Sequence, residues 1–216
     1  MAKKQFKAES KRLLDLMINS VYTNREIFLR EIISNASDAI DKLCYLSLTD
    51  DKVGLSRDDF KIEITLDREN RTITVSDNGI GMSAEDLENN LGVIAKSGSY
   101  QFKQDTKDED TGSDVDVIGQ FGVGFYSAFM VSEKVQVISR KYGEESANSW
   151  ESSGVDGYVI TPCQKDTVGT DVILHLKEDT ENDKYSDFLQ EHTIVSIIKK
   201  YSDYIRWPIV MEVEKS

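Results

Sequence analysis

The chain has 216 residues, of which 39% are hydrophobic and 30% are charged, a composition typical of a globular protein with a buried core. Lys and Arg total 26 against 39 Asp and Glu, so the formal net charge is −13. This excess of acid argues against a nucleic-acid-binding surface and against docking on anionic lipid, so we expect neither a nucleic acid nor a membrane as a partner.

Two features of the composition bear on the compartment. The two cysteines, Cys44 and Cys163, lie in unrelated segments without metal-ligand spacing, which predicts reduced thiols in a reducing compartment. The N-terminus runs directly into charged residues with no secretory pattern, and no apolar run approaches the ~20 residues of a membrane span. These features predict a cytoplasmic protein.

The first fifty residues predict helices, the longest over residues 26–46 without Gly or Pro. Glu31, Asn35, Asp38 and Lys42 are spaced to lie on one stripe of that helix, where a carboxylate base would lie beside an amide ligand for a cation. The opposite half of the helix is apolar, so an amphipathic helix with a solvated face explains the same pattern. Taken alone, the stripe favours the solvated face.

Two alternating segments, residues 60–67 and 71–77, predict a β-hairpin whose second strand ends at Asp77. Gly79 and Gly81 follow at once, so bare backbone can approach whatever the carboxylate binds. A flat heterocycle with an exocyclic amino group would suit such an acceptor. An Asx turn with an extra glycine is the alternative, and the spacing does not decide between them. A short helix is expected to begin near residue 83.

Residues 96–118 form a long acidic stretch with Gly and Ser, of a length that is usually functional or disordered within a compact domain. The segment Gly119-Gln-Phe-Gly-Val-Gly124 follows and is expected to lead into a helix, where backbone N–H groups would form an anion site. It matches neither the dinucleotide fingerprint nor a P-loop. A hinge for the preceding stretch is a compatible alternative.

The rest of the chain predicts strands near residues 134–140, 158–161 and 171–177, a helix over 191–204 and a last strand over 209–214. The regular βαβ alternation of a doubly wound sheet is missing. We therefore expect an α+β fold with a mixed sheet that has helices on one face.

Several segments together carry a family resemblance. The segments Glu31-Ile-Ile-Ser-Asn35-Ala-Ser-Asp-Ala, Asp77-Asn-Gly-Ile-Gly81-Met and Gly119-Gln-Phe-Gly-Val-Gly124-Phe-Tyr-Ser resemble the three boxes of the GHKL ATPases. With Asn89-Asn90-Leu-Gly-Val-Ile-Ala-Lys96-Ser-Gly98 and Trp150-Glu-Ser, the chain resembles more closely the N-terminal domain of bacterial heat-shock protein 90 chaperones. The resemblance spans essentially the whole chain.

The resemblance implies a two-layer α/β sandwich with a mixed, mostly antiparallel sheet that binds ATP or ADP with Mg²⁺. It implies a single nucleotide-binding domain over residues 1–216, with a lid over residues 91–122 that closes over ATP and excludes water. The implied function is slow ATP hydrolysis within a molecular chaperone that assists protein folding and the stress response through lid closure and conformational cycling.

The resemblance also implies roles for single residues. Asp77 would accept the adenine amino group with Thr170 assisting through water, Gly81 and Met82 would line the base, and the two glycines would keep side chains out of its way. Glu31 would be the general base for the attacking water. Asn35 would coordinate Mg²⁺ that bridges the phosphates. The other residues implied in ATP binding are Asp38, Lys42, Asn90, Lys96, Gly119, Gln120, Phe121, Gly122, Val123, Gly124 and Phe125.

Asn78 departs from the family pattern, which usually has Ser or Thr there, and the lid begins Ser-Gly-Ser where Ser-Gly-Thr is commoner. The sequence ends after residues 207–214, where the family continues into middle and dimerisation domains, so we expect an excised domain that is mainly monomeric. The resemblance implies client proteins as partners, a homodimeric full-length protein, and a pocket that ansamycin or resorcylic-lactone inhibitors can occupy.

Other functions remain open. A histidine-kinase catalytic domain would need an acceptor histidine, and the chain has only His175 and His192, neither in an acceptor-like context. A topoisomerase or mismatch-repair ATPase would expose a basic surface, which the net charge opposes. A nucleotide-dependent binding module without meaningful catalysis is the remaining alternative.

Overall fold

The computed structural model of the chain describes residues 3–4, 24–92 and 124–212. The helices are α2 (Ile27–Ser47), α3 (Ala84–Leu91) and α6 (Glu191–Tyr201), with short 3₁₀ helices η1 (Asp51–Val53), η2 (Arg57–Asp59), η3 (Gly124–Met130) and η4 (Tyr185–Leu189). The strands are β1 (Ile62–Asp67), β2 (Thr72–Asp77), β3 (Ser132–Arg140), β4 (Ala147–Ser152), β5 (Tyr158–Cys163), β6 (Gly169–Leu176) and β7 (Ile209–Met211).

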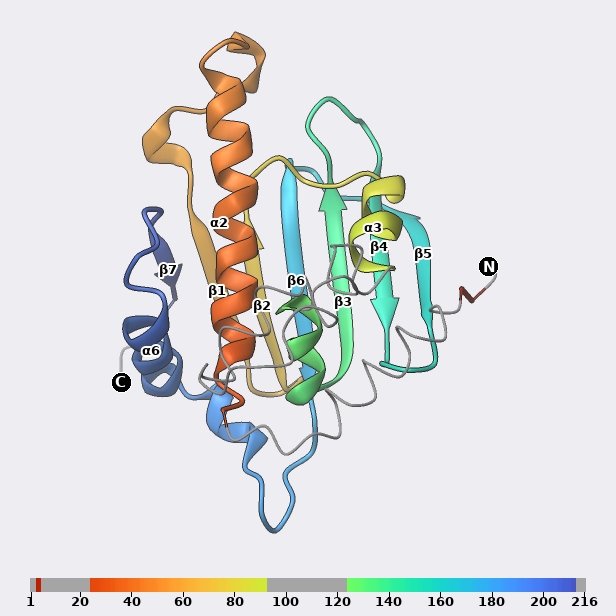
Figure 1. Cartoon of the computed structure of the whole chain (residues 1–216), viewed down its shortest axis with the longest axis vertical. Coiled ribbons are helices and arrows are strands. Elements are labelled where there is room, and N and C mark those ends of the chain that lie inside the picture. The colour runs from red at the N-terminus through yellow and green to blue at the C-terminus, as the bar shows by residue number, and fades with distance from the viewer. Residues whose placement is uncertain (1–2, 5–23, 93–123, 213–216) are drawn as a thin grey trace, which may run out of the picture.

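The seven strands form one sheet in the order β5-β4-β3-β6-β2-β1-β7. The β1–β7 pair is parallel and the other neighbouring pairs are antiparallel. Helix α2 crosses the sheet in front of β1 and β2, and α3 lies in front of β4 and β5 (Figure 1). This arrangement confirms the predicted α+β fold with a mixed, mostly antiparallel sheet and helices on one face.

Helix α2 joins the two layers because its apolar half is buried against the sheet. Phe28, Leu29, Ile33 and Ile40 are fully buried there. Complete burial of a side chain of this size contributes about 1.5–3 kcal/mol relative to leaving it in water, so these residues fix the orientation of the helix about its axis. The polar stripe is consequently held at one constant position above the sheet.

The structure differs from the sequence predictions in four elements. The helix expected after Gly124 is the 3₁₀ helix η3, and the predicted helix over 191–204 ends at Tyr201. The last strand, predicted over 209–214, is β7, which ends at Met211, and residues 213–214 lie outside the described residues. Strand β4 was not predicted, because only Ala147 and Trp150 among its six residues are apolar. It forms because it lies between β3 and β5 and carries the fully buried Trp150. The acidic stretch over 96–118 lies outside the described residues.

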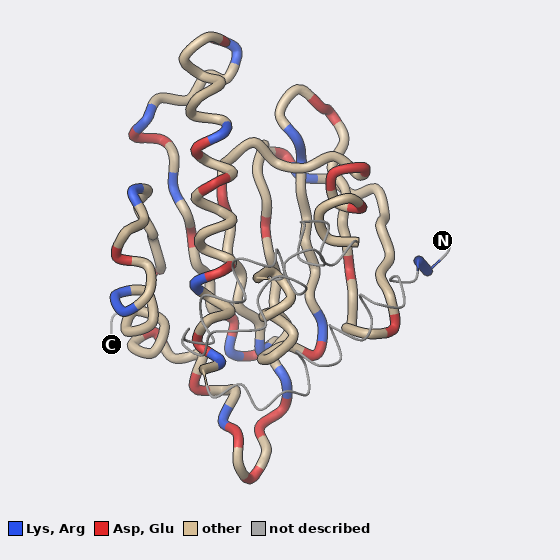
Figure 2. Tube along the Cα trace, viewed as in Figure 1, with Lys and Arg blue, Asp and Glu red and all other residues tan. Residues whose placement is uncertain are grey.

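Charged residues of both signs are interspersed along the described parts of the chain (Figure 2). Within those parts, Lys and Arg form no extended basic stretch. None of the described helices combines the length and the apolar character needed to cross a membrane.

Candidate functional site

A cavity of about 570 Å³ lies between α2, α3, η3 and the sheet. It brings together residues from all three predicted boxes, which are distant from one another in the sequence. The predicted site residues that line it are Glu31, Asn35, Asp38, Lys42, Asp77, Gly81, Met82, Asn90, Gly124, Phe125 and Thr170. The predicted residues Lys96, Gly119, Gln120, Phe121, Gly122 and Val123 lie outside the described residues.

The polar stripe of α2 forms one wall of this cavity. Asn35, Asp38 and Lys42 are exposed, while Glu31, one turn nearer the helix start, is only 8% exposed. The four side chains therefore do more than face bulk solvent, and the cavity wall is the better explanation of the stripe than a solvated face.

The Glu31 carboxylate is bound by Arg30 and lies close to Gly124. Its Oε1 accepts hydrogen bonds from Nε and Nη2 of Arg30, at 3.1 and 2.9 Å. A Cβ placed on Gly124 would lie 2.2 Å from Glu31 Oε2, so any other residue there would displace the carboxylate. Gly124, at the end of the glycine-rich motif, therefore leaves room for Glu31, the candidate general base on α2. Arg30 was missed because neighbouring helical residues usually point in different directions.

Asp77 is the last residue of β2 and lies across from Thr170 of β6. Its side chain is buried and its Oδ1 accepts a hydrogen bond from Gly79 N–H at 2.9 Å. Burial raises the pKa of Asp77 from 3.8 to about 7, and the Gly79 hydrogen bond only partly offsets this rise. No ion pair reaches Asp77 from the described residues. A buried carboxyl group with spare acceptor capacity therefore faces the cavity.

The role expected for the two glycines after Asp77 was wrong. A Cβ on Gly79 would lie 2.4 Å from the Ala39 carbonyl carbon of α2, and one on Gly81 would lie 2.0 Å from the Arg140 carbonyl oxygen of β3. Both glycines therefore face protein backbone, and their lack of a side chain permits close packing of this loop between helix and sheet. Gly81 also has φ +68°, which favours glycine. Its backbone still lines the cavity, as expected.

Asn78 has a structural role. Its Oδ1 accepts a hydrogen bond from Lys61 N–H at 2.9 Å, and its Nδ2 donates to the Asp59 carbonyl at 2.7 Å. Asn78 does not line the cavity. Asn78, which stands where Ser or Thr is usual, thus connects the loop to the segment before β1 through these two hydrogen bonds.

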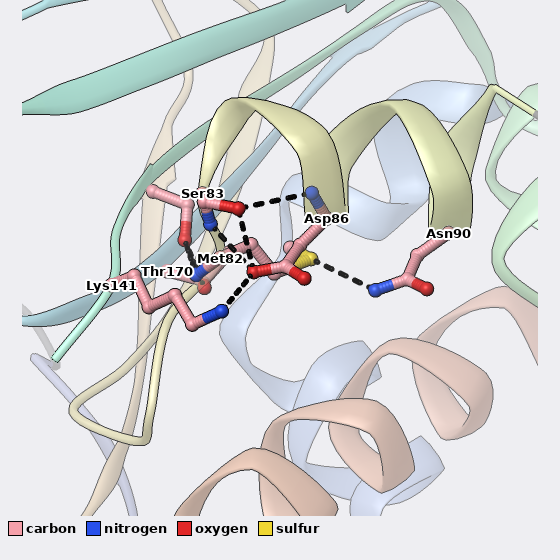
Figure 3. Close-up of polar contacts among 7 residues, drawn as sticks. Met82, Ser83, Asp86, Asn90, Lys141 and Thr170 are labelled. Atoms are coloured by element: carbon pink, nitrogen blue, oxygen red, sulfur yellow. Dashed lines mark hydrogen bonds and ion pairs between the residues drawn. The ribbon is translucent and has the colours of Figure 1, made fainter.

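A polar cluster at the start of α3 adds two cavity residues that sequence reasoning missed, Asp86 and Lys141 (Figure 3). Ser83 and Asp86 form a reciprocal helix cap, and Lys141 Nζ donates to Asp86 Oδ2 at 2.7 Å. Burial by itself would raise the pKa of Asp86, but the hydrogen bonds from Lys141 and Ser83 outweigh it and lower the pKa. The Ser-x-x-Asp spacing signals the cap in the sequence. Lys141 approaches from the position directly after β3, and no local pattern in the sequence signals this contact.

The described residues include no group of three His, Cys, Asp or Glu side chains that could hold a metal ion. Asn35, which carries one amide oxygen, lines the cavity one turn along α2 from Glu31. That donor set fits Mg²⁺, which takes few protein oxygens and completes its shell with water and phosphate oxygens.

Comparison with known proteins gives the family. A sequence model described as histidine kinase-, DNA gyrase B-, and HSP90-like ATPase matches residues 22–170. The chain is 60% identical over its whole length to "Chaperone protein HtpG" of Clostridium acetobutylicum, and 59% and 56% identical to proteins of that name from Clostridium botulinum strain Langeland and Natranaerobius thermophilus. It covers 34% of each of these relatives, so it spans about a third of their length.

These matches confirm the predicted likeness to bacterial chaperones of the heat-shock protein 90 type. The family match covers more than two thirds of the chain and includes α2, the loop after Asp77 and Thr170. The chain therefore belongs to the histidine kinase-, DNA gyrase B- and HSP90-like ATPase family.

Proposed function

We propose that the chain binds ATP and ADP in the cavity and hydrolyses ATP slowly, as the nucleotide-binding domain of a molecular chaperone. The observation that carries this proposal is the convergence of three separate sequence motifs on one cavity. That cavity has a buried carboxyl acceptor at Asp77 and a second carboxylate, Glu31, oriented by Arg30.

Asp77 and its neighbours form the base end of the cavity. The adenine amino group would donate to the Asp77 carboxylate, which has no cation partner among the described residues and so keeps acceptor capacity for a ligand. Thr170 would assist through water, and the Gly81 backbone and the Met82 side chain would lie against the flat face of the base. This end supplies recognition of the base and no chemistry.

Glu31 and Asn35 belong to the phosphate end. Glu31 would act as general base toward the water that attacks the terminal phosphate, because a fixed carboxylate within one hydrogen bond of that water can accept its proton. Asn35 would hold Mg²⁺, whose charge neutralises the phosphate oxygens when it is bound. Gly124 keeps room for the Glu31 carboxylate. Asp38, Lys42, Asn90 and Phe125 would complete the wall, with Lys96 and the segment 119–123 as further phosphate contacts.

Other parts of the proposal rest on the relatives. Their name, chaperone protein, supports a role in protein folding and the stress response, with unfolded or client proteins as partners. We propose that residues 1–216 form one nucleotide-binding domain with a lid over residues 91–122. We also propose that the full-length protein is a cytoplasmic homodimer and that ansamycin or resorcylic-lactone compounds compete with nucleotide. Cys44 and Cys163 form no disulfide, as a reducing compartment requires.

The family includes kinases and gyrases, so its model alone does not separate the alternatives. The identity to chaperones over the whole chain favours the chaperone. A histidine kinase would retain the terminal phosphate of labelled ATP on His175 or His192, whereas the proposed ATPase releases it as free phosphate. A pure binding module would release none.

The test is a calorimetric titration of Mg-ADP into the wild-type chain and into Asp77→Asn. The amide presents N–H groups where the carboxylate only accepts, so a charge-assisted bond is lost. This loss should cost ~1.5–3 kcal/mol, or about tenfold to a hundredfold in affinity.

Asp203→Asn is the matched control, since Asp203 is exposed and does not line the cavity, and it should bind like wild type. Equal ADP affinity of wild type and Asp77→Asn would mean that the adenine base does not bind at Asp77. Absence of ADP binding by the wild-type chain would overturn the proposal altogether.

A further inference from the structure

Ser139 is a buried hydroxyl directly behind the base end of the cavity. It lies one residue before the end of β3 and has no exposed surface. Its Oγ accepts a hydrogen bond from Met82 N–H at 2.8 Å, lies 2.8 Å from Thr170 Oγ1 and lies 3.2 Å from the Gly169 carbonyl oxygen. Figure 3 shows Met82 and Thr170 side by side within this polar group. One hydroxyl of β3 thus contacts the neighbouring strand β6 and the loop after Asp77.

The position of Ser139 along β3 is unusual. Side chains alternate along a strand, and the preceding residues of the same face, Val135 and Val137, are buried and apolar. Another valine would continue the core but would leave Met82 N–H without this acceptor. A polar residue at a position where the alternation of the strand predicts an apolar one therefore indicates a specific hydrogen-bonding role. This pattern is visible in the sequence.

The hydrogen bonds of Ser139 constrain the proton of Thr170. Met82 N–H can only donate and the Gly169 carbonyl can only accept, while each hydroxyl has one proton. If Ser139 donates to Thr170, which is the shorter of its two contacts, the Thr170 proton can turn into the cavity. If Ser139 donates to Gly169, Thr170 must donate to Ser139 and presents only lone pairs to the cavity. Ser139 therefore controls whether Thr170 acts as a donor.

We propose that Ser139 is a positioning residue for base recognition, which fixes the Met82 backbone and orients Thr170 as a donor to the water that would bridge it to the base, beside the Asp77 acceptor. This inference rests on the proposed adenine-nucleotide function. An acceptor next to a donor complements adenine, whose amino group donates while the adjacent ring nitrogen accepts. Hypoxanthine presents the reverse pattern, a carbonyl beside a ring N–H. Ser139 would thus contribute to selection of adenine over hypoxanthine without touching the base.

The test is calorimetric titration of ADP and of the hypoxanthine nucleotide IDP into the wild-type chain and Ser139→Ala. Without Ser139, Thr170 is free to rotate and serves either base. We expect ADP affinity to fall about tenfold and IDP affinity to fall less, so that the preference for ADP drops by at least about threefold. Ser139→Thr, which keeps the hydroxyl, should restore most of the preference.

Ser132→Ala is the matched control because Ser132 lies on the same strand, is equally buried, and its hydroxyl has no hydrogen-bond partner among the described residues. It should leave both affinities unchanged. Thr170→Val should lower the preference by itself, and adding Ser139→Ala to it should lower the preference little further, since both changes act through one hydroxyl.

Two results would overturn the inference alone: unchanged ADP affinity in Ser139→Ala, or equal losses of ADP and IDP, which indicate a packing role only. A wild-type chain that binds neither nucleotide would instead overturn the proposed function, and this inference with it.

Discussion

The carboxylates at the two ends of the cavity, Glu31 and Asp77, have opposite surroundings. At the phosphate end, Glu31 is bound by two nitrogens of Arg30 and rests against Gly124. At the base end, Asp77 is buried, accepts a backbone hydrogen bond from Gly79 and forms no ion pair with the described residues. Its pKa is consequently raised to about 7, because burial disfavours the charged form.

This difference shows how one cavity can separate recognition from chemistry. A base that receives a proton during a reaction must be oriented before the substrate arrives, and Arg30 orients Glu31. An acceptor that recognises a ligand must keep its hydrogen-bonding capacity unused, and burial of Asp77 without a cation leaves that capacity to the ligand. Burial of Asp77 without a cation costs stability in the empty protein, whereas Glu31, which is bound by Arg30, carries no such cost.

The largest effect that we expect is on stability, from Asp77→Asn. The folded chain keeps a proton on Asp77 between about pH 4 and 7, where the unfolded chain has lost it, since the pKa rises from 3.8 to about 7 on folding. The stability contributed by this group is therefore complete below pH 4 and is lost as the pH rises to about 7. Asn does not titrate, so the variant should be more stable at pH 8 by roughly 4 kcal/mol at most.

Thermal unfolding of both proteins at about pH 4 and pH 8 measures this effect. The stability difference should be small at the lower pH and large at the higher one. Asp203→Asn, at an exposed position, should show no such difference. An advantage for Asp77→Asn of equal size at both pH values would mean that Asp77 carries no buried charge.

Glu31→Gln should lower ATP turnover more than about a hundredfold, or by ~3 kcal/mol in the activation barrier, because the amide cannot accept the proton of the attacking water. ADP affinity by calorimetry should stay within about threefold. Glu63→Gln removes the charge of a partly exposed β1 residue that pairs with Lys61 outside the cavity, and it should leave turnover unchanged. ATP turnover that survives in Glu31→Gln would mean that a residue other than Glu31 is the general base.

Gly81→Ala should destabilise the base end by about 2 kcal/mol more than Gly143→Ala. Both glycines have positive φ, +68° and +83°, but a Cβ on Gly81 would meet the Arg140 carbonyl at 2.0 Å and one on Gly143 meets nothing within 4 Å. Denaturant unfolding of the two variants gives the difference directly. Equal losses of stability in the two variants would mean that Gly81 is needed only for its positive φ and not for close packing against Arg140.

The smallest effect concerns the pH dependence of ADP binding. Because the carboxylate form of Asp77 accepts the amino group, affinity should fall toward tenfold for each pH unit below about 7 and level off above it. Asp77→Asn serves as the control, since it has the same nucleotide titrations and lacks this one. Parallel pH profiles for the two proteins would exclude Asp77 as the titrating group.

Much of the fold was predictable from local patterns. The 3.6-residue period of α2 and the alternation of β1 and β2 are set by which side chains avoid water, and the structure confirms them. Strand β4 was not predictable in this way, because its residues are mostly polar and its burial depends on neighbours from elsewhere in the chain. Residue type and spacing made Asp77 and the stripe from Glu31 to Lys42 candidates but left a turn and a solvated face as alternatives, and the family resemblance assigned these residues to a site.

The sequence by itself determined the residue types of the cavity and the family to which the chain belongs, since motifs and periodicity are local properties. Only the tertiary structure decided how those residues are supported: the contact of Arg30 with Glu31, the approach of Lys141 to Asp86, and the position of Ser139 behind Met82 and Thr170. It also showed that Gly79 and Gly81 pack against backbone. Most of these contacts join segments that are far apart in the chain, and all depend on side-chain directions that packing sets, so no local pattern specifies them.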